Sequence, residues 1–156
     1  MKREHIRNLG NDLWCLDSWW KWQELEVNGV PPCPRRGHSA VVMGSCMYIF
    51  GGLYGFSKYL NDLCVYDGET NSWSKARIVG ALKPPPRAWH SCTVIGNGNS
   101  AHWKQMLVFG GTAGRCVFFN DVWIFDAHSM SWFEVESKRS VFVGCVCVCC
   151  VYVYAV

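Results

Sequence analysis

The stretch Met47-Tyr48-Ile49-Phe50-Gly51-Gly52 is an apolar run closed by two glycines, and it recurs as Met106-Leu107-Val108-Phe109-Gly110-Gly111. Ten residues after the first glycine of each pair stands an Asn-Asp dipeptide, Asn61-Asp62 or Asn120-Asp121. A third such dipeptide, Asn11-Asp12, lies 50 residues before Asn61. Repetition at this period indicates one supersecondary unit, copied along the chain, that must stack on its neighbours to bury its faces.

Each unit reads as short strands separated by tight turns. In the second copy the strands are predicted at 38–43, 46–50, 62–66 and 73–77. The third copy repeats this pattern from His90 to about Glu136, with a polar insertion at 96–102 between its first two strands. The first copy holds only the last two strands, between Asp12 and Val27. The chain is therefore predicted to be all-β.

Composition narrows the range of functions. The chain has 156 residues, nine tryptophans and a net charge of only +3, so nucleic acid is not expected as the main partner. The charged segment Met1 to Asn8 is followed by no apolar stretch and lacks the pattern of a secretory signal, so we expect a cytoplasmic or nuclear protein. The ten cysteines are then expected to stay reduced, and their spacing does not match a structural zinc site.

The units share two further signatures. Each complete copy opens with a Pro-Arg-x-x-His-Ser turn, at 34–39 and 86–91. An aromatic residue stands seven positions before a tryptophan, as Tyr66 before Trp73 and Phe125 before Trp132. Together with the Gly-Gly pairs, these features resemble the Kelch repeat over residues 11–136.

The resemblance implies a partial Kelch-type β-propeller. It would contain two full four-stranded antiparallel blades, at 37–78 and 89–136, and half a blade at 11–27. The glycine pairs would permit a tight exit where blades crowd, and the aromatic pairs would pack between blades. The residues given a structural role on this basis are Gly51, Gly52, Gly110, Gly111, Tyr66, Trp73, Phe125, Trp132, His38 and His90.

The histidines and arginines of the opening turns have two interpretations. His38 and His90 hold equivalent places, with Arg35 and Arg87 three residues earlier. In a closed propeller this ring would lie near the central channel, where it could contact a ligand. In the structural interpretation, each histidine hydrogen-bonds neighbouring backbone and each arginine pairs with a carboxylate of the adjacent blade.

The loops after the glycine pairs are the candidate binding elements. Loops 53–60 and 112–119 have equal length, combine aromatic with basic residues, and are expected on the same rim as the Pro-Arg turns. Aromatic and arginine side chains dominate protein-binding hot spots. Alternatively, Tyr59, Leu60, Phe118 and Phe119 enter the next strand and pack. The predicted partner-binding residues are Tyr54, Phe56, Lys58, Arg115, Arg35 and Arg87.

Both ends of the chain depart from a complete propeller, which needs roughly four to eight blades. Residues 1–10 form a charged segment, and 137–156 form a Val/Cys/Tyr-rich tail that we interpret as translated intron or microsatellite sequence. A membrane anchor and a soft-metal site at Cys145, Cys147, Cys149 and Cys150 are the alternatives for the tail. Residues 141–156 of the tail are also an aggregation hazard, since they are uncharged and rich in β-formers. Open blade faces would favour self-association.

The function expected from the sequence is a non-enzymatic, intracellular interaction module or scaffold that binds other proteins. Its full-length form could serve as a substrate receptor of a ubiquitin ligase, a role implied by the resemblance alone. No catalytic residue, metal or cofactor is predicted, because no catalytic order of Ser, His and Asp, phosphate loop or H-E-x-x-H motif is present. The alternatives are a truncated fragment without independent activity and part of a metal-dependent propeller enzyme.

Overall fold

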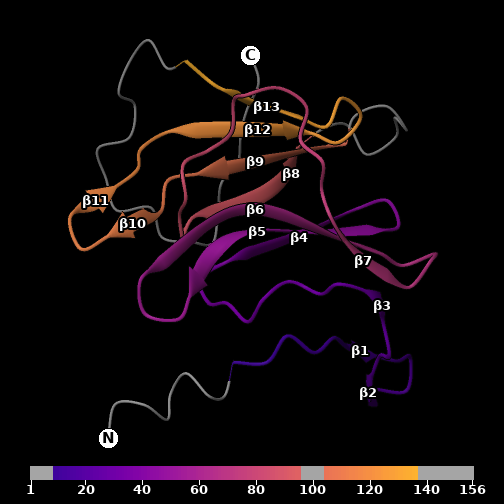
Figure 1. Cartoon of the computed structure of the whole chain (residues 1–156). Helices are drawn as coiled ribbons and strands as arrows, with labels where there is room; N and C mark the ends of the chain where they lie inside the picture. Colours follow the sequence, from indigo (N-terminus) through magenta and orange to yellow (C-terminus); the bar gives the residue numbers. More distant parts are fainter. Residues whose placement is uncertain (1–8, 96–103, 137–156) are drawn as a thin grey trace, which may run out of the picture.

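The computed structural model describes residues 9–95 and 104–136, and within them every regular element is a β-strand (Figure 1). The predicted insertion at 96–102, residues 1–8 of the charged segment and the tail at 137–156 lie outside the described residues. The described strands form sheets that are antiparallel apart from one short parallel pair, as a partial propeller requires.

The second blade is built from β4 to β7. Its strands are β4 (Ser39–Met43), β5 (Cys46–Tyr54), β6 (Lys58–Asp67) and β7 (Ser72–Lys75). Each pairs antiparallel with the next, and a two-residue strand, β3 (Asn28–Gly29), adds to the outer edge in parallel with β7. This sheet therefore has five strands rather than the four expected, because the linker after the first unit pairs with the blade.

The third blade and the first half-blade follow the same order. The third blade consists of β8 (Ser91–Ile95), β9 (Gln105–Phe109), β12 (Val122–Asp126) and β13 (Ser131–Glu134). The half-blade is the hairpin of β1 (Trp14–Leu16) and β2 (Trp22–Glu24). The predicted strands are thus present in all three copies, with boundaries shifted by a few residues.

The segments 53–60 and 112–119, which read as connecting loops in the sequence, are largely β-hairpins. β5 continues through Gly51 and Gly52 to Tyr54, and β6 begins at Lys58. In the third blade, the separate strands β10 (Thr112–Gly114) and β11 (Val117–Phe118) form the matching hairpin. The register shifts between Phe50 and Gly52, and both glycines have positive φ, so the glycine pair bends the strand without ending it.

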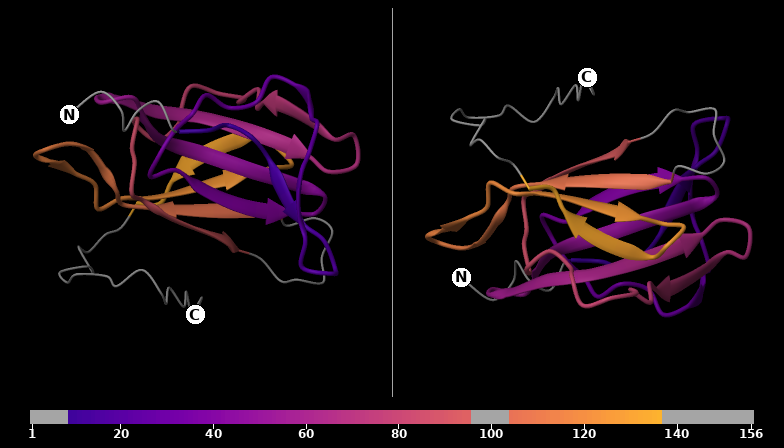
Figure 2. Two further views of the ribbon diagram at one scale, coloured as in Figure 1. Left: turned by 90° about the horizontal axis from the view of Figure 1, so that it is seen from below. Right: turned by 90° about the horizontal axis from the view of Figure 1, so that it is seen from above.

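Alternation along the strands gives each blade two apolar faces. One face of the second blade carries Tyr48 and Phe50, which meet Phe125 and Trp132 of the third blade. The ring centroids of Phe50 and Trp132 are 4.9 Å apart, and Trp132 is only 4% exposed. The main core therefore lies between the second and third blades, which stack face to face in Figure 2.

The opposite face of the second blade packs against the half-blade. Ile49, Cys64 and Trp73 form a smaller buried cluster there, against Leu13 and Val27 of the first unit. The half-blade buries less on its own outer face. Trp22, which follows the first-unit motif as Trp73 and Trp132 follow theirs, is 66% exposed.

We predict that the two motif tryptophans differ sharply in their contribution to stability. Trp132→Ala should lower the free energy of unfolding by about 3–5 kcal/mol, because it opens a cavity in the main core. Trp22→Ala should change it by less than about 0.5 kcal/mol, since most of that ring already contacts water. Urea unfolding followed by circular dichroism measures both values, and equal losses would contradict the assignment of the core.

Candidate functional site

Four segments meet at one end of the two complete blades, and we call them the hairpin rim: residues 34–38, 53–60, 82–89 and 112–119. The opening turn of each blade is bonded to the start of its hairpin. Arg36 and Leu53 exchange backbone hydrogen bonds of 3.1 and 2.8 Å, and Ala88 and Thr112 exchange two of 2.9 Å. Figure 1 shows both hairpins projecting from the same end of the sheets.

Arg87 lies beneath this rim in a closed socket. Its side chain is fully buried and makes two hydrogen bonds of 2.7 Å to the carboxylate oxygens of Asp121. Its Nη1 also donates to the carbonyl of Gly110 at 2.9 Å, and its guanidinium lies 4.2 Å from the ring centroid of Phe119. This bidentate geometry fixes the guanidinium in one orientation.

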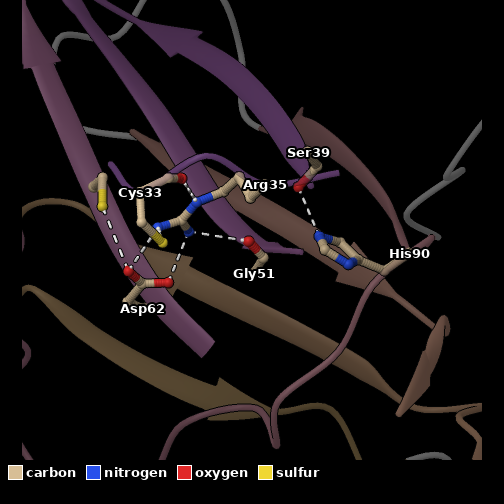
Figure 3. Close-up of polar contacts among 7 residues, drawn as sticks. Cys33, Arg35, Ser39, Gly51, Asp62 and His90 are labelled. Carbon is tan, nitrogen blue, oxygen red and sulfur yellow. Dashed lines mark hydrogen bonds and ion pairs between the residues drawn. The ribbon is translucent and has the colours of Figure 1, made fainter. Parts of the chain in front are cut away.

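Arg35 occupies the equivalent socket of the second blade (Figure 3). It donates to both carboxylate oxygens of Asp62, at 2.8 and 3.0 Å, and to the carbonyl of Gly51 at 3.0 Å. Its remaining donors reach the carbonyl and the sulfur of Cys33.

The carboxylates of both sockets stay ionised. Burial alone would raise the pKa of Asp62, but the hydrogen bond and charge of Arg35 outweigh burial and lower it. The pKa of Asp121 is lowered in the same way, against its burial, by Arg87 and by the indole of Trp123. Each socket is therefore an internally neutralised ion pair.

The sockets correct two expectations. Arg35 and Arg87 pair with carboxylates of their own blades, whereas the structural interpretation had placed the carboxylate on the adjacent blade. The backbone makes the contact between blades instead: Arg87 N donates to the carbonyl of Leu60 at 2.9 Å, and Gly52 N donates to the carbonyl of Arg87 at 2.8 Å. Because both guanidinium groups are buried and fully paired, neither is available to a partner protein.

His90 also links the two blades. Its Nε2 lies 2.7 Å from the hydroxyl of Ser39 on the second blade (Figure 3). Its ring packs edge-on against Phe50. His90 was expected to hydrogen-bond neighbouring backbone, so this side-chain partner is a further correction. Burial, with a smaller contribution from the charge of Arg87, lowers the pKa of His90 to about 4. His90 is therefore neutral at physiological pH, whereas His38 lies exposed beside Gly52.

The predicted partner-binding residues of the hairpins lie at the surface. Tyr54, Phe56 and Lys58 surround the turn between β5 and β6, and Phe56 is 68% exposed. Arg115 is exposed at the turn between β10 and β11. The alternative prediction, that the later aromatic residues pack inward, holds for some positions only. Tyr59, Leu60 and Phe119 are half-buried, while Phe118 is exposed.

Trp89 is a rim residue that the sequence reasoning did not select. It is 55% exposed, has a φ of 55°, donates from its backbone to Gly37 at 2.7 Å, and meets Tyr59 edge-on. Aligning the two opening turns puts Trp89 opposite Gly37, whose φ is 64°. A left-handed conformation costs about 1–2 kcal/mol for a residue with a side chain. The sequence alignment of the two opening turns, with tryptophan in one and glycine in the other, could therefore have marked Trp89 as unusual.

The described residues contain no group of three or more His, Cys, Asp or Glu side chains that could hold a metal ion. Their six cysteines are free, and burial raises the pKa of the Cys64 and Cys92 thiols to about 11. In the same part of the chain, no helix has the length and apolarity needed to cross a membrane.

Known proteins are similar to this chain in sequence. The family model described as the KLHDC2/KLHL20/DRC7 Kelch-repeats domain matches residues 3–155. Host cell factor 1 of Rattus norvegicus is 34% identical over 139 residues, which cover 78% of this chain and 7% of that protein. Host cell factor 2 of Homo sapiens is 34% identical over 148 residues, covering 84% of this chain and 18% of that protein. The flagellar outer arm dynein alpha chain of Chlamydomonas reinhardtii is 36% identical over 121 residues, covering 74% of this chain and 2% of that protein. The chain thus spans less than a fifth of the length of each of these relatives.

We predict that the Arg87 socket is essential for stability. Arg87→Met should lower the free energy of unfolding by about 3–5 kcal/mol, because it leaves the Asp121 carboxylate without its counterion. The exposed Arg36→Met is the matched control and should change stability by less than about 0.5 kcal/mol. Equal small losses in urea unfolding would contradict a structural role for the socket.

We also predict an acid-dependent loss of stability through His90. The pKa of His90 is about 4 in the folded chain, against 6.5 for an unperturbed histidine. Between pH 6.5 and 4, His90 is therefore protonated in the unfolded chain and neutral in the folded chain. Stability should be unaffected above pH 7 and fall by up to about 3 kcal/mol as the pH drops from 6.5 to 4. The free energy of unfolding of His90→Gln, measured across the same pH range, should not fall in this way. An equal fall in both proteins would show that a group other than His90 causes the pH dependence.

Proposed function

Because this chain belongs to the Kelch-repeat family, we propose that its hairpin rim is the surface through which it binds another protein. Kelch-repeat domains are protein–protein interaction modules, and their blades act as a scaffold. The observation that supports the rim as a binding surface is the contrast between its buried arginines and its exposed basic and aromatic side chains. The arginines of the sockets are internally paired, while Tyr54, Phe56, Lys58 and Arg115 point outward without a structural task.

The hairpins present these side chains on ordered backbone. Tyr54 pairs directly with Lys58 across the tip of the β5–β6 hairpin. In the other hairpin, the Thr112 hydroxyl donates a hydrogen bond of 2.7 Å to the carbonyl of Gly114. Side chains held on a fixed backbone lose less conformational entropy on binding, which favours affinity.

Three finer hypotheses are compatible with an interaction module: substrate recognition for a ubiquitin ligase, a cytoplasmic or nuclear location, and self-association through open blade faces. The alternative hypotheses are a fragment without activity and part of a metal-dependent enzyme. The interaction module is the function that the exposed hairpin residues favour.

We predict that a rim triple variant loses its partner. Tyr54→Ala, Phe56→Ala and Arg115→Ala combined should lower recovery of bound proteins from cells of the native source by at least about tenfold, since truncating each hot spot costs more than about 1 kcal/mol. Quantitative mass spectrometry of affinity-captured material measures the change.

The matched control lies at the opposite end of the same blades. Glu69→Ala with His128→Ala removes two exposed side chains from the far turns and should leave capture unchanged. Both variants should unfold at the urea concentration of the wild type. Equal capture by the rim variant and the wild type would rule out the hairpin rim as the binding surface.

A further inference from the structure

The hairpin rim has an unbalanced charge. Its four segments contain six lysine and arginine residues and no aspartate or glutamate. Two of the six, Arg35 and Arg87, are neutralised in their sockets by Asp62 and Asp121. The other four form no ion pair with a described residue; they are Arg36, Lys58, Lys83 and Arg115.

The opposite end of the two blades has a different balance. Its turns carry Asp67, Glu69 and Asp126 against one lysine, Lys104. The exposed Arg77 lies nearby, two residues before Val79, which donates to the carbonyl of Met130 at this end. The outermost strands carry both positive and negative side chains, with Lys75 on β7 and Glu134 on β13. Positive charge is therefore concentrated at the end where the hairpins project, although the whole chain carries only +3.

An aromatic side chain stands where the two blades meet at this rim. Trp89 is held over Gly37 and beside Tyr59, in a left-handed backbone conformation that glycine would adopt with less strain. Strained residues with exposed side chains are characteristic of functional surfaces, because the fold must compensate their cost elsewhere. A tryptophan buries a large apolar area on binding and still offers its N–H to a partner.

We propose that the hairpin rim recognises an anionic peptide segment whose apolar side chain packs against Trp89 and Tyr59. Carboxylates on either side of that anchor face the four unpaired cations. This inference rests on the proposed function of the rim and names the chemistry of its partner. A protein ligand fits better than nucleic acid, because the whole chain carries a net charge of only +3.

Selection of random dodecapeptides displayed on phage, against the full chain, tests this inference. The enriched peptides should carry net negative charge and at least one aromatic or large aliphatic residue. Dissociation constants of synthetic representatives, measured by calorimetry at two salt concentrations, should rise with salt as expected for partly screened surface charges.

Two variants test separately the contribution of the Trp89 ring and the contribution of the rim cations to peptide binding. Trp89→Gly removes the ring and installs the residue found at the equivalent position 37, so it should fold normally and weaken binding at least about tenfold. Lys58→Glu with Arg115→Glu cancels the positive charge of the two remaining unpaired cations, so it should weaken binding by a similar factor and remove the salt dependence. Lys104→Glu at the opposite end is the matched control and should bind as the wild type does.

The outcomes distinguish this inference from the proposed function. If rim variants weaken binding but the enriched peptides are neutral or basic, or the charge reversal has no effect, the anionic partner is wrong and the rim remains the binding surface. If neither Trp89→Gly nor the Tyr54, Phe56 and Arg115 triple variant affects binding, both fail. A selection without enrichment, or tighter binding of single-stranded oligothymidylate than of any peptide, overturns the anionic peptide, while partner capture still decides the proposed function.

Discussion

The second and third blades depend on the interactions of one buried residue, Arg87. Its side chain closes the third blade by binding Asp121 and the carbonyl of Gly110, while its backbone bonds Leu60 and Gly52 of the second blade. A buried arginine is tolerated only where every donor is satisfied, so its presence fixes the carboxylate, the glycine carbonyl and the hairpin around it. Arg87 therefore joins the second blade to the third, because its backbone and its side chain serve different blades, and it acts together with His90 and the shared core.

The glycine pairs are the second half of this arrangement. A Cβ at Gly51 would lie 2.7 Å from the carbonyl oxygen of Arg87, and one at Gly111 would lie 2.7 Å from that of Ala88. Both distances are shorter than any real contact of this kind, so the opening turn can lie across the sheet only where the side chain is missing. The resulting bend also carries the chain onward into the hairpins, so the element that permits blade stacking is the one that creates the rim.

Much of this could be read from the sequence, because the relevant signals are local. The apolar runs, the turn residues and the spacing from Gly-Gly to Asn-Asp predicted the strands and their order within each blade. The hairpins were missed because the loops 53–60 and 112–119 lack strict alternation, and their pairing depends on a register shift at the glycines. The partners of Arg35, Arg87 and His90 were assigned wrongly, since sequence periodicity places a residue in a unit but does not say which blade its side chain enters. Trp89 was overlooked because its meaning lies in a comparison with Gly37 and in a backbone angle that only coordinates reveal.

The half-blade shows which features of the repeat form from the local sequence and which require a neighbouring strand. Trp14 donates its indole N–H to Asp12 just as Trp123 donates to Asp121, so the Asp-x-Trp contact forms from the local sequence alone. Yet Trp123 is buried and Trp14 is exposed, and Asp12 forms no ion pair with an arginine among the described residues. The difference is the neighbouring strand: β12 pairs with β9, whereas β1 pairs only with β2 in the described part of the chain. The motif therefore sets the geometry of a strand end, while burial and the arginine socket come from stacking and pairing with a second element. The binding surface follows the same rule, because the hairpins, the opening turns and Trp89 are brought together only where two complete blades meet.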